Sequence, residues 1–341
     1  MLLLAPSDGA IRERLISELA DVELRFASEL NSDLICVNDL IQHVERYRGK
    51  MFRPTLTLVA AMACEPDRNE TDEAHRVVAT VVEMIHMATL VHDDILDEAR
   101  LRRRGATINH LAGNEAAVML GDYLISHAYH LCSVLDQPWI SRLLATTTNT
   151  ICEGELLQLA NRNNWTLDER IYFDIIGRKT ASLCGTCSRL AAVLSRTDES
   201  VAQGLTEYGQ KVGVAYQIID DVLDLTGDPQ VVGKTLGRDL ETGKLTLPLI
   251  HELTTAEPSQ RDQLLKWLKA LDNADQTDQD RNHLVFQLGQ QLVSGAAVGY
   301  ARQQAVELVN QAKAAVVDQL PESDARTLLL DMADAILDRG R

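Results

Sequence analysis

The sequence has little proline and almost none of the alternation that marks β-strands. Proline occurs 8 times in 341 residues, and Val, Ile and Thr seldom alternate with polar residues. Apolar residues recur instead at intervals of three and four, as on one face of a helix. Examples run from Ile11 to Phe26, from Val78 to Thr89 and from Leu205 to Ile219. These patterns predict an all-α protein of roughly ten or more helices.

Breaks between the helices are predicted where polar residues, glycine and proline gather. They fall at residues 65–73, 135–139, 161–166, 226–248 and 271–280. No shift of composition and no long flexible linker divides the chain, and no short-period repeat is present. The sequence therefore predicts a single domain over residues 1–341, in which residues 1–30 form an N-terminal helix or arm.

The chain also lacks long apolar runs, and we expect no secretory leader. The first residues, MLLLAPSDG, have neither a basic segment nor sufficient apolar length, and no uncharged stretch reaches the length of a membrane span. The six cysteines are scattered. The C-x-x-C of Cys184 and Cys187 has no thioredoxin-like context and no second pair of ligands. We expect a reduced, soluble, cytoplasmic protein with these two residues buried on a helix.

Basic residues are outnumbered, with 33 Lys and Arg against 50 Asp and Glu and a formal net charge of -17. Such a chain repels nucleic acid and anionic membranes in general, so any anion that it binds requires a local basic group. One such group is present at residues 100–104, which include Arg100, Arg102, Arg103 and Arg104. It directly follows an apolar segment that carries three acids.

The acids form the pattern Asp-Asp-x-x-Asp twice, at Asp93, Asp94 and Asp97 and again at Asp220, Asp221 and Asp224. On a helix the first and third acid of each motif share a face. Helix caps or a solvated acidic face would explain one such motif. Two motifs on apolar backgrounds favour metal ligands, because buried carboxylates require compensating cations. Mg²⁺ prefers oxygen ligands and is commonly coordinated by protein carboxylates and substrate phosphates together. Arginine binds phosphate in a bidentate manner. The sequence therefore predicts a site for Mg²⁺ and a diphosphate.

Further basic residues occur near these motifs. They are Lys50 and Arg53, Lys179 beside Thr180, and Lys234 and Lys244 in a Gly-rich segment after the second motif. A Gly-rich segment with lysines is weak evidence alone, since it also fits a surface connection. Beside the second acidic motif it predicts a loop that closes over phosphates.

Taken together, these segments resemble the polyprenyl synthetases, the trans-type isoprenyl diphosphate synthases. The motifs that carry the resemblance are, in chain order, GKMFRP, EMIHMATLVHDDILDEARLRR, GNEAAVMLGDYL, EGELLQL, RKTASL, YQIIDDVLD and GKTLGRDLETGKLTLP. They span about residues 45–255, and the flanking helices fit as well. The resemblance implies an all-α bundle around a deep central cavity, with the two acidic motifs facing each other at its mouth. It also implies a homodimer.

The same resemblance implies a role for each candidate residue. Three Mg²⁺ ions per active site, two on the first motif and one on the second, would be held by Asp93, Asp94, Asp97, Asp220, Asp221 and Asp224. The allylic diphosphate would be bound by Arg102, Lys179, Lys234 and Lys244. Isopentenyl diphosphate would be bound by Lys50, Arg53, His86 and Arg103. Thr180 and Gln217 would border the reacting carbon and join Lys179, Lys234 and Arg102 as catalytic residues.

Two positions depart from the family's pattern. Met51 stands where a second basic residue is usual, so one phosphate contact is in doubt. Arg104 separates Arg103 from Gly105, which leaves open which of the two arginines makes the contact. For His86, an ordinary core histidine is the alternative interpretation.

The implied reaction is the head-to-tail condensation of isopentenyl diphosphate with dimethylallyl, geranyl, farnesyl or geranylgeranyl diphosphate, by ionisation, condensation and elimination. Nucleic acid is not an expected partner, and membrane contact is at most peripheral, for product release. Three alternatives come from other classes. They are a class I terpene cyclase, which has one Asp-rich motif, a regulatory subunit of a heteromeric synthase, which lacks these motifs, and a helical scaffold with acidic patches.

Product length is predicted from the helix that carries the first motif. Ala88 and Thr89 lie about one turn, roughly 5 Å, before Asp93, and neither is bulky; Ile85 lies one turn further. On the opposing segment the candidate floors of a product tunnel are Tyr123, His127 and Tyr129. Tyr129 or Ile85 is the first residue to test by shortening. We predict a product longer than farnesyl, from hexaprenyl to decaprenyl, with geranylgeranyl or farnesyl diphosphate as the alternatives.

Overall fold

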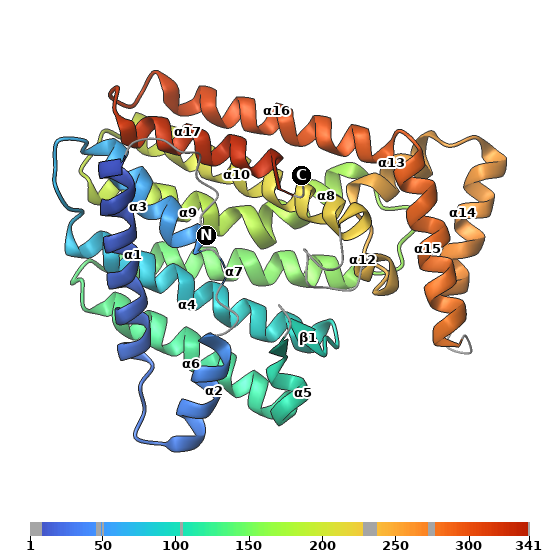
Figure 1. Ribbon diagram of the computed structural model, residues 1–341, viewed down its shortest axis with the longest axis horizontal. Helices are drawn as coiled ribbons and strands as arrows, with labels where there is room; N and C mark the ends of the chain where they lie inside the picture. Colours follow the sequence, from blue (N-terminus) through green and yellow to red (C-terminus); the bar gives the residue numbers. More distant parts are fainter. Residues whose placement is uncertain are drawn as a thin grey trace. The chain divides into compact units, whose positions relative to one another are not determined.

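The computed structural model describes residues 9–45, 49, 51–102, 105–227, 237–271 and 277–339. Helices make up nearly all of the regular structure in this part of the chain (Figure 1). The single sheet found there pairs two strands of two residues each, β1 (Leu101–Arg102) and β2 (Gly105–Ala106). The predicted all-α fold is therefore confirmed. Four residues of the expected site, Lys50, Arg103, Arg104 and Lys234, lie outside the described residues.

The chain divides into two compact units, each assembled from segments that are distant in sequence. The first unit comprises residues 1–149, 183–210 and 311–335, and the second comprises residues 150–182, 211–310 and 336–341. Each acidic motif therefore belongs to a different unit. The single domain over residues 1–341 stays a prediction.

The first unit is organised around α4. Its elements are α1 (Gly9–Glu29), α2 (Ile35–Glu45), α3 (Phe52–Cys64), α4 (Glu73–Leu96), β1, β2, α5 (Ile108–Ala112), α6 (Asn114–Ser133), α9 (Ser182–Leu194), and the parts of α7 (Pro138–Ala160), α10 (Glu199–Thr226), α16 (Ala297–Val317) and α17 (Asp324–Leu337) that fall in its ranges. Helix α4 packs against α1, α3 and α6, and Figure 1 shows α4 and α6 side by side. The N-terminal helix α1 buries Leu15, Val22 and Phe26 in this unit.

Helix α4 is apolar along most of its length because it passes through the core of the first unit. By length and composition alone it could cross a membrane, but 72% of its most apolar stretch is buried inside the protein. Its apolar side chains, such as Val78, Val81 and Ile85, recur at helical spacing and are buried. The first acidic motif therefore lies at the end of a buried core helix.

The second unit contains shorter helices around the C-terminal part of α10. They are α8 (Glu169–Ile176), the π-helix η1 (Gly177–Ala181), α12 (Arg238–Glu241), α13 (Leu247–Thr255), α14 (Pro258–Leu271), α15 (Asp278–Ser294), and the remaining parts of α7, α10, α16 and α17. Helix α13 packs against α8, α14 and α15. Helices α14 and α15 lie side by side as a hairpin (Figure 1).

The helix ends agree with the breaks predicted from sequence. Helix α3 ends at Cys64 and α4 begins at Glu73, while α7 ends at Ala160 and α8 begins at Glu169. Asp168 caps α8, because its side chain accepts a hydrogen bond from the Ile171 N–H at 2.9 Å. The polar residue before α8 thus satisfies a helix terminus.

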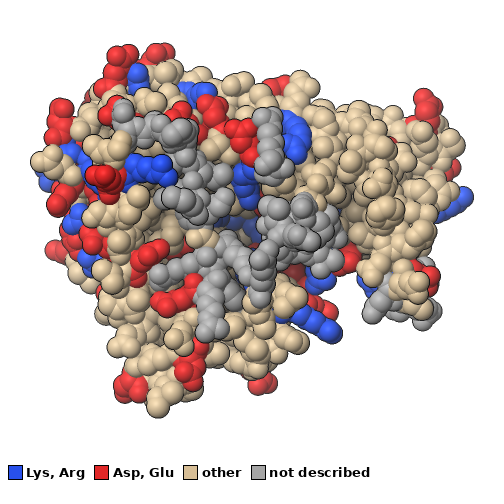
Figure 2. All heavy atoms as spheres, in the orientation of Figure 1, with Lys and Arg blue, Asp and Glu red and all other residues tan. Residues whose placement is uncertain are grey.

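Cys184 and Cys187 lie buried on α9 with free thiols, as expected for small core residues. Burial raises the pKa of both thiols, which keeps them protonated and unreactive. On the face drawn in Figure 2, acidic and basic side chains are intermixed. The acidic excess of the chain is therefore not collected into one patch on that face.

Candidate active site

The first acidic motif begins in the last turn of α4 and continues past its end. Asp93 and Asp94 are helical, whereas Asp97 is the C-cap residue, with φ -94° and ψ 2°. The Asp97 N–H still donates to the Asp93 carbonyl at 2.9 Å. Glu98 follows at φ 48°, in the left-handed region that ends helices. The motif is thus carried by a helix terminus, and only its first two acids are inside the helix.

Asp94 is bound by Arg102, which follows it in the β1 strand. The Arg102 Nε donates to both carboxylate oxygens, at 2.9 and 3.0 Å, and Nη2 lies 2.8 Å from Oδ1. Only 2% of Asp94 is exposed. Burial raises the pKa of Asp94, and the Arg102 guanidinium opposes that rise. The Asn109 amide on α5 donates to the Asp94 carbonyl at 3.1 Å and to the Ala99 carbonyl at 3.2 Å, so it ties the segment between motif and arginine to the helix end.

Two residues of the expected isopentenyl diphosphate site are described, and both are half-buried in the first unit. Arg53 lies in the first turn of α3, and its buried Nε has no hydrogen-bond partner among the described residues. His86 lies on α4. The neighbouring Met51 is buried at φ 52°. Its apolar side chain is part of the core and offers no contact to a phosphate.

The candidate chain-length residues lie on α4 and α6, which pack together. Ile85 and Ala88 are buried, and Thr89 is half-buried. The Tyr129 hydroxyl donates to Thr148 Oγ1 on α7 at 3.2 Å. Tyr123 reaches the other way, toward the Leu30 carbonyl at 3.5 Å. The two tyrosines of α6 therefore face different neighbours, and their role as floors of a product tunnel stays a prediction.

The second acidic motif lies on α10, where Asp221 is the centre of a hydrogen-bonded chain. The Tyr172 hydroxyl donates to Asp221 Oδ2 at 2.7 Å, and the Gln217 amide donates to Oδ1 at 2.8 Å. Thr180 in turn donates to Gln217 Oε1 at 3.0 Å. The structure thus brings Thr180 and Gln217 together with the second motif and adds Tyr172, which the sequence did not suggest.

Asp221 has its carboxyl group in a strongly desolvated environment. It is 6% exposed, and burial, followed by the negative charge of Asp239, raises its pKa well above the usual value. Burial and the adjacent Asp221 also raise the pKa of the Tyr172 phenol. The donors on Asp221, a phenol and an amide, are neutral. The ionised carboxylate therefore requires a cation for full compensation.

The other two acids of the second motif have different partners. Asp220 Oδ1 accepts from Arg339 Nη2 at 3.0 Å. Asp224 Oδ2 accepts from the backbone N–H of Asp239 at 3.1 Å, and its carbonyl accepts from the Gly237 N–H at 2.8 Å. Asp220 is thus linked to the end of α17, and Asp224 to the start of α12.

Lys179 and Thr180 are presented by the π-helix η1, a local widening that is frequent at functional sites. The Lys179 ammonium donates to Gln158 Oε1 at 3.1 Å and pairs with Glu155, both on α7. Gly154 lets α7 approach this turn closely. A Cβ atom at position 154 would stand 2.6 Å from the Lys179 nitrogen and 2.7 Å from the Arg178 Cβ.

A polar cavity of about 70 Å³ joins these groups within the second unit. Its walls include Lys179, Thr180, Gln217, Asp221, Tyr172, Gln158, Asp239 and Lys244. Two cationic side chains and two carboxylates therefore border one small space. Such an arrangement can hold an oxyanion and the cations that accompany it.

The donor set fits Mg²⁺ better than a metal held by protein alone. Among the described residues, no three His, Cys, Asp or Glu side chains are grouped closely enough to hold a metal ion. Mg²⁺ is commonly bound through one or two carboxylates, with water and substrate phosphates completing its shell. Asp221 fits this role, because its carboxyl group is buried and its two hydrogen-bond donors are neutral.

Four residues that the sequence analysis did not name contact the second motif or its neighbour Lys179. They are Tyr172, Gln158, Asp239 and Arg339. Gln158 and Asp239 stand inside the quoted motifs EGELLQL and GKTLGRDLETGK, so their motifs were the available signal. Tyr172 and Arg339 carry no local signal, because their partners are 49 and 119 residues away.

A model of the family described as polyprenyl synthetase matches residues 36–284. The chain belongs to the polyprenyl synthetase family. Octaprenyl diphosphate synthase of Escherichia coli (strain K12) is 33% identical over 331 residues, which are 97% of this chain and 98% of that protein. All-trans-nonaprenyl-diphosphate synthase (geranyl-diphosphate specific) of Rhodobacter capsulatus is 37% identical over 311 residues, 91% of each chain.

A solved member of the family has the same fold. It is the polyprenyl synthase from Caulobacter crescentus CB15, complexed with calcium and isoprenyl diphosphate, with a TM-score of 0.87 and 29% identity. The match covers 98% of this chain and 100% of the other. The resemblance to polyprenyl synthetases and the isoprenoid-synthase type of fold are thereby confirmed.

Proposed function

We propose that the protein is a Mg²⁺-dependent prenyltransferase that condenses isopentenyl diphosphate head-to-tail onto an allylic diphosphate. Its product is a trans-polyprenyl diphosphate longer than farnesyl. The observation that carries the proposal is the cavity in which Lys179 and Lys244 border the same space as Asp221 and Asp239. A diphosphate with its metal counter-ions is the substrate group that matches this mixture of charges.

In the first unit, Asp93, Asp94 and Asp97 are the proposed metal ligands. Arg102 holds Asp94 in a bidentate pair and is the proposed contact to the allylic diphosphate. Arg53, with its buried Nε lacking a hydrogen-bond partner among the described residues, suits the diphosphate of isopentenyl diphosphate. His86 belongs to the same proposed subsite, together with Lys50 and Arg103 from outside the described residues.

In the second unit, Asp220, Asp221 and Asp224 are the proposed metal ligands. Tyr172 and Gln217 fix the Asp221 carboxylate by donating to one oxygen each. Lys179 and Lys244 bind diphosphate oxygens, and Lys234 is proposed to join them. Thr180 and Gln217 border the reacting carbon, where their mutual hydrogen bond holds both side chains in one orientation.

When bound, Mg²⁺ would neutralise the negative charge that develops on the leaving diphosphate; we propose three ions, two on the first motif and one on the second. The chain's own cations stabilise the same charge, which favours breaking of the allylic C–O bond. The double bond of isopentenyl diphosphate then supplies the electron pair of the new C–C bond. A proton leaves the resulting cation for the departed diphosphate, and a new double bond forms.

The product is proposed to be in the range from hexaprenyl to decaprenyl. The similarity to proteins named octaprenyl and nonaprenyl diphosphate synthase supports this range. The small side chains of Ala88 and Thr89 on α4 support it as well. Geranylgeranyl or farnesyl diphosphate would be the product if Ile85 or Tyr129 closed the space earlier.

A product assay tests the proposal. Purified protein receives isopentenyl diphosphate with each of dimethylallyl, geranyl, farnesyl and geranylgeranyl diphosphate, with Mg²⁺ or with EDTA, and products are sized by mass spectrometry. We expect chains longer than geranylgeranyl with Mg²⁺ and none with EDTA. Asp221→Asn should abolish turnover, and the exposed Asp262→Asn on α14 is the matched control.

Each alternative gives a different result in this assay. No condensation from any primer by the protein alone would favour a regulatory subunit, and addition of a catalytic partner would then restore activity. Conversion of one allylic diphosphate into a cyclic hydrocarbon without isopentenyl diphosphate would indicate a terpene cyclase. Cell fractionation and light scattering test the accompanying expectations of a cytoplasmic homodimer with at most peripheral membrane contact.

A further inference from the structure

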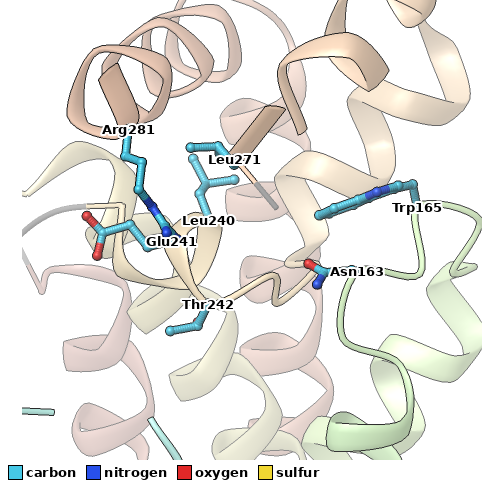
Figure 3. Close-up of a pocket in the computed structure, with 7 residues that line it drawn as sticks. All are labelled: Asn163, Trp165, Leu240, Glu241, Thr242, Leu271 and Arg281. Atoms are coloured by element: carbon cyan, nitrogen blue, oxygen red, sulfur yellow. The ribbon is translucent and has the colours of Figure 1, made fainter. Parts of the chain in front are cut away.

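A second cavity in the second unit lies outside the proposed catalytic residues. It has a volume of about 110 Å³. Figure 3 shows the indole of Trp165 reaching in from one side and Arg281 extending from α15 on the other. Leu240 and Leu271 supply apolar walls, and Thr242 borders the space. The cavity thus combines a flat aromatic ring, a guanidinium and aliphatic surface.

Arg281 supplies the positive charge among the residues that line this cavity. Its guanidinium makes no hydrogen bond or ion pair with any other described residue. Glu241 also lines the space, but its carboxylate pairs with Arg238 at 3.2 Å and is turned away from Trp165 in Figure 3. A carboxylate so close disfavours a doubly charged guest, whereas one guanidinium suits a single carboxylate.

The size of the cavity limits its guest to about one ring. Drug-sized ligands occupy roughly 300–1,000 Å³, so neither a nucleotide nor a polyprenyl chain fits within 110 Å³. The cavity is smaller than the apolar cavity of about 150 Å³ that is known to admit benzene, so one ring is the upper limit for the part of a guest that lies inside its 110 Å³. Indole faces favour offset or edge contacts with a second aromatic ring. The guest indicated by these walls is therefore a small aromatic ring with one negative charge.

The short helix α12 forms the wall between this cavity and the proposed catalytic one. Leu240 and Thr242 face the cavity of Arg281, whereas Asp239 faces the cavity of Asp221. The Asp239 N–H is also bonded to Asp224 of the second acidic motif. A guest that packs on Leu240 would therefore touch the element that holds Asp224.

The other walls are connected to α12 as well. The Asn163 N–H, in the loop that carries Trp165, donates to the Gly243 carbonyl at 2.9 Å. Gly237 precedes α12 at φ 73°, and a Cβ atom there would stand 2.3 Å from Val285 Cγ1. Val285 is one turn from Arg281 on α15. Close contacts thus join both sides of the cavity to the two ends of α12.

We propose that this cavity is a binding site for a small aromatic monocarboxylate, which stacks on Trp165 and pairs with Arg281. Its occupation steadies α12 and through it the Asp224 carboxylate. The site is an effector site, because none of the residues proposed to bind diphosphate or metal lines it. The first part of the proposal is independent of the proposed function. The coupling to Asp224 rests on the metal role proposed there.

Binding can be measured by the fluorescence of Trp165 alone. The chain has two other tryptophans, Trp139 and Trp267, and replacing both by phenylalanine isolates the signal. Benzoate is the probe, and benzamide and acetate are the controls for charge and ring. We expect a saturable change with benzoate at millimolar concentration, roughly 1–10 mM. Benzamide and acetate should each bind at least about tenfold more weakly.

Variants of Arg281 decide whether the guanidinium holds the guest. Arg281→Gln should weaken benzoate binding about tenfold or more, and Arg281→Lys should fall between it and the parent. Arg261→Gln, at an exposed position of the adjacent helix α14, should leave binding unchanged. Thermal unfolding shows whether each variant is folded. If Arg281→Gln does not fold, the benzoate affinity of Arg281→Lys decides whether the guanidinium holds the guest.

Three results would overturn the site: no saturable change with benzoate up to about 50 mM, equal binding in Arg281→Gln, or equal binding of inorganic phosphate and benzoate. The coupling is tested by repeating the benzoate titration with Mg²⁺. Mg²⁺ should raise the benzoate affinity at least about twofold, and benzoate should raise the Mg²⁺ affinity by the same factor. Unchanged affinities in a protein that binds Mg²⁺ would overturn the coupling, whereas failure to bind Mg²⁺ would count against the proposed function instead.

Discussion

The guanidinium of Arg339 lies between Asp220 and Tyr216. Its Nη2 donates to Asp220 Oδ1 at 3.0 Å, and its Cζ lies 3.9 Å from the centre of the Tyr216 ring. Asp220 and Tyr216 are one turn apart on α10, so a single residue beyond α17 contacts both. A cation of the chain therefore occupies the place beside Asp220 that a metal ion would share.

Removing that cation should strengthen metal binding. In Arg339→Gln, the carboxylate of Asp220 keeps its charge but loses the competing guanidinium, so a divalent cation is attracted more strongly. The pair is partly exposed, and we expect a gain of only about two- to fivefold in Mn²⁺ or Mg²⁺ affinity by calorimetry. Arg339→Lys should remain near the parent.

The matched control for this prediction is Lys313→Gln. Lys313 pairs with Asp334 at 2.7 Å, is also partly exposed, and is far along the chain from both acidic motifs. Its loss should not change metal affinity. Weaker metal binding in Arg339→Gln would mean that Arg339 orients Asp220 for the metal instead of competing with it.

Gly154→Ala should impair catalysis by displacing Lys179. The added Cβ would meet the Lys179 nitrogen at 2.6 Å, so α7 and η1 must move apart. Overpacking of this kind costs about 1–3 kcal/mol of stability, and a displacement near 1 Å at a catalytic group can cost about 10²-fold in rate. We expect kcat to fall at least about tenfold.

Gly177→Ala is the control within the same π-helix. A Cβ atom at position 177 meets nothing within 4 Å, so turnover should stay within about twofold of the parent. Steady-state kinetics and thermal unfolding of both variants separate displacement from general destabilisation. Equal kcat in a folded Gly154→Ala would show that the close approach of α7 does not position Lys179.

The sequence predicted the helices well because their signal is local. The helical spacing of apolar residues in α10 predicted that Asp220, Asp221 and Asp224 lie on one helix. What it could not predict were contacts between helices, such as the Tyr172 hydroxyl on Asp221, made across 49 residues. The π-helix at Lys179 and the end of α4 before Asp97 were also missed. The single Gly177 at the start of the π-helix does not by itself signal a widened turn, and no glycine or proline directly follows the end of α4.

Acid should destabilise the first unit through His75. This residue is fully buried on α4, with Nε2 3.2 Å from the Ala191 carbonyl and 3.2 Å from Ser195 Oγ. Burial lowers the pKa of His75 below its ordinary value of 6.5, and the Ala191 contact opposes this only in part. Below pH 6.5 the unfolded chain binds a proton that folded His75 resists. The unfolding free energy therefore falls from pH 6.5 downward, until the lowered pKa is passed.

Urea unfolding between pH 7.5 and 5, a range about the ordinary pKa, measures this effect. In His75→Gln, which does not titrate, the loss of stability with falling pH should be smaller than in the parent. His110→Gln, at an exposed position of α5, is the control and should follow the parent. Parallel curves for His75→Gln and the parent would exclude His75 as the source of the acid sensitivity.

Enlarging Ala88 should shorten the product. Ala88 is fully buried on α4, about one turn before Asp93, so a phenylalanine there would occupy the path proposed for the growing chain. We expect Ala88→Phe to make mainly geranylgeranyl or farnesyl diphosphate, with a loss of about 1–3 kcal/mol in stability from overpacking. Mass spectrometry of the products gives the chain length directly.

Overpacking by itself must be separated from closure of that path. Ala305→Phe on α16 replaces an equally buried alanine at a position far along the chain from the acidic motifs. It should lose comparable stability while the product length stays that of the parent. If both variants shorten the product, the effect follows from loosened packing, and Ala88 does not set chain length. If Ala88→Phe alone does so, and Tyr129→Ala lengthens the parent's product, the chain grows between α4 and α6.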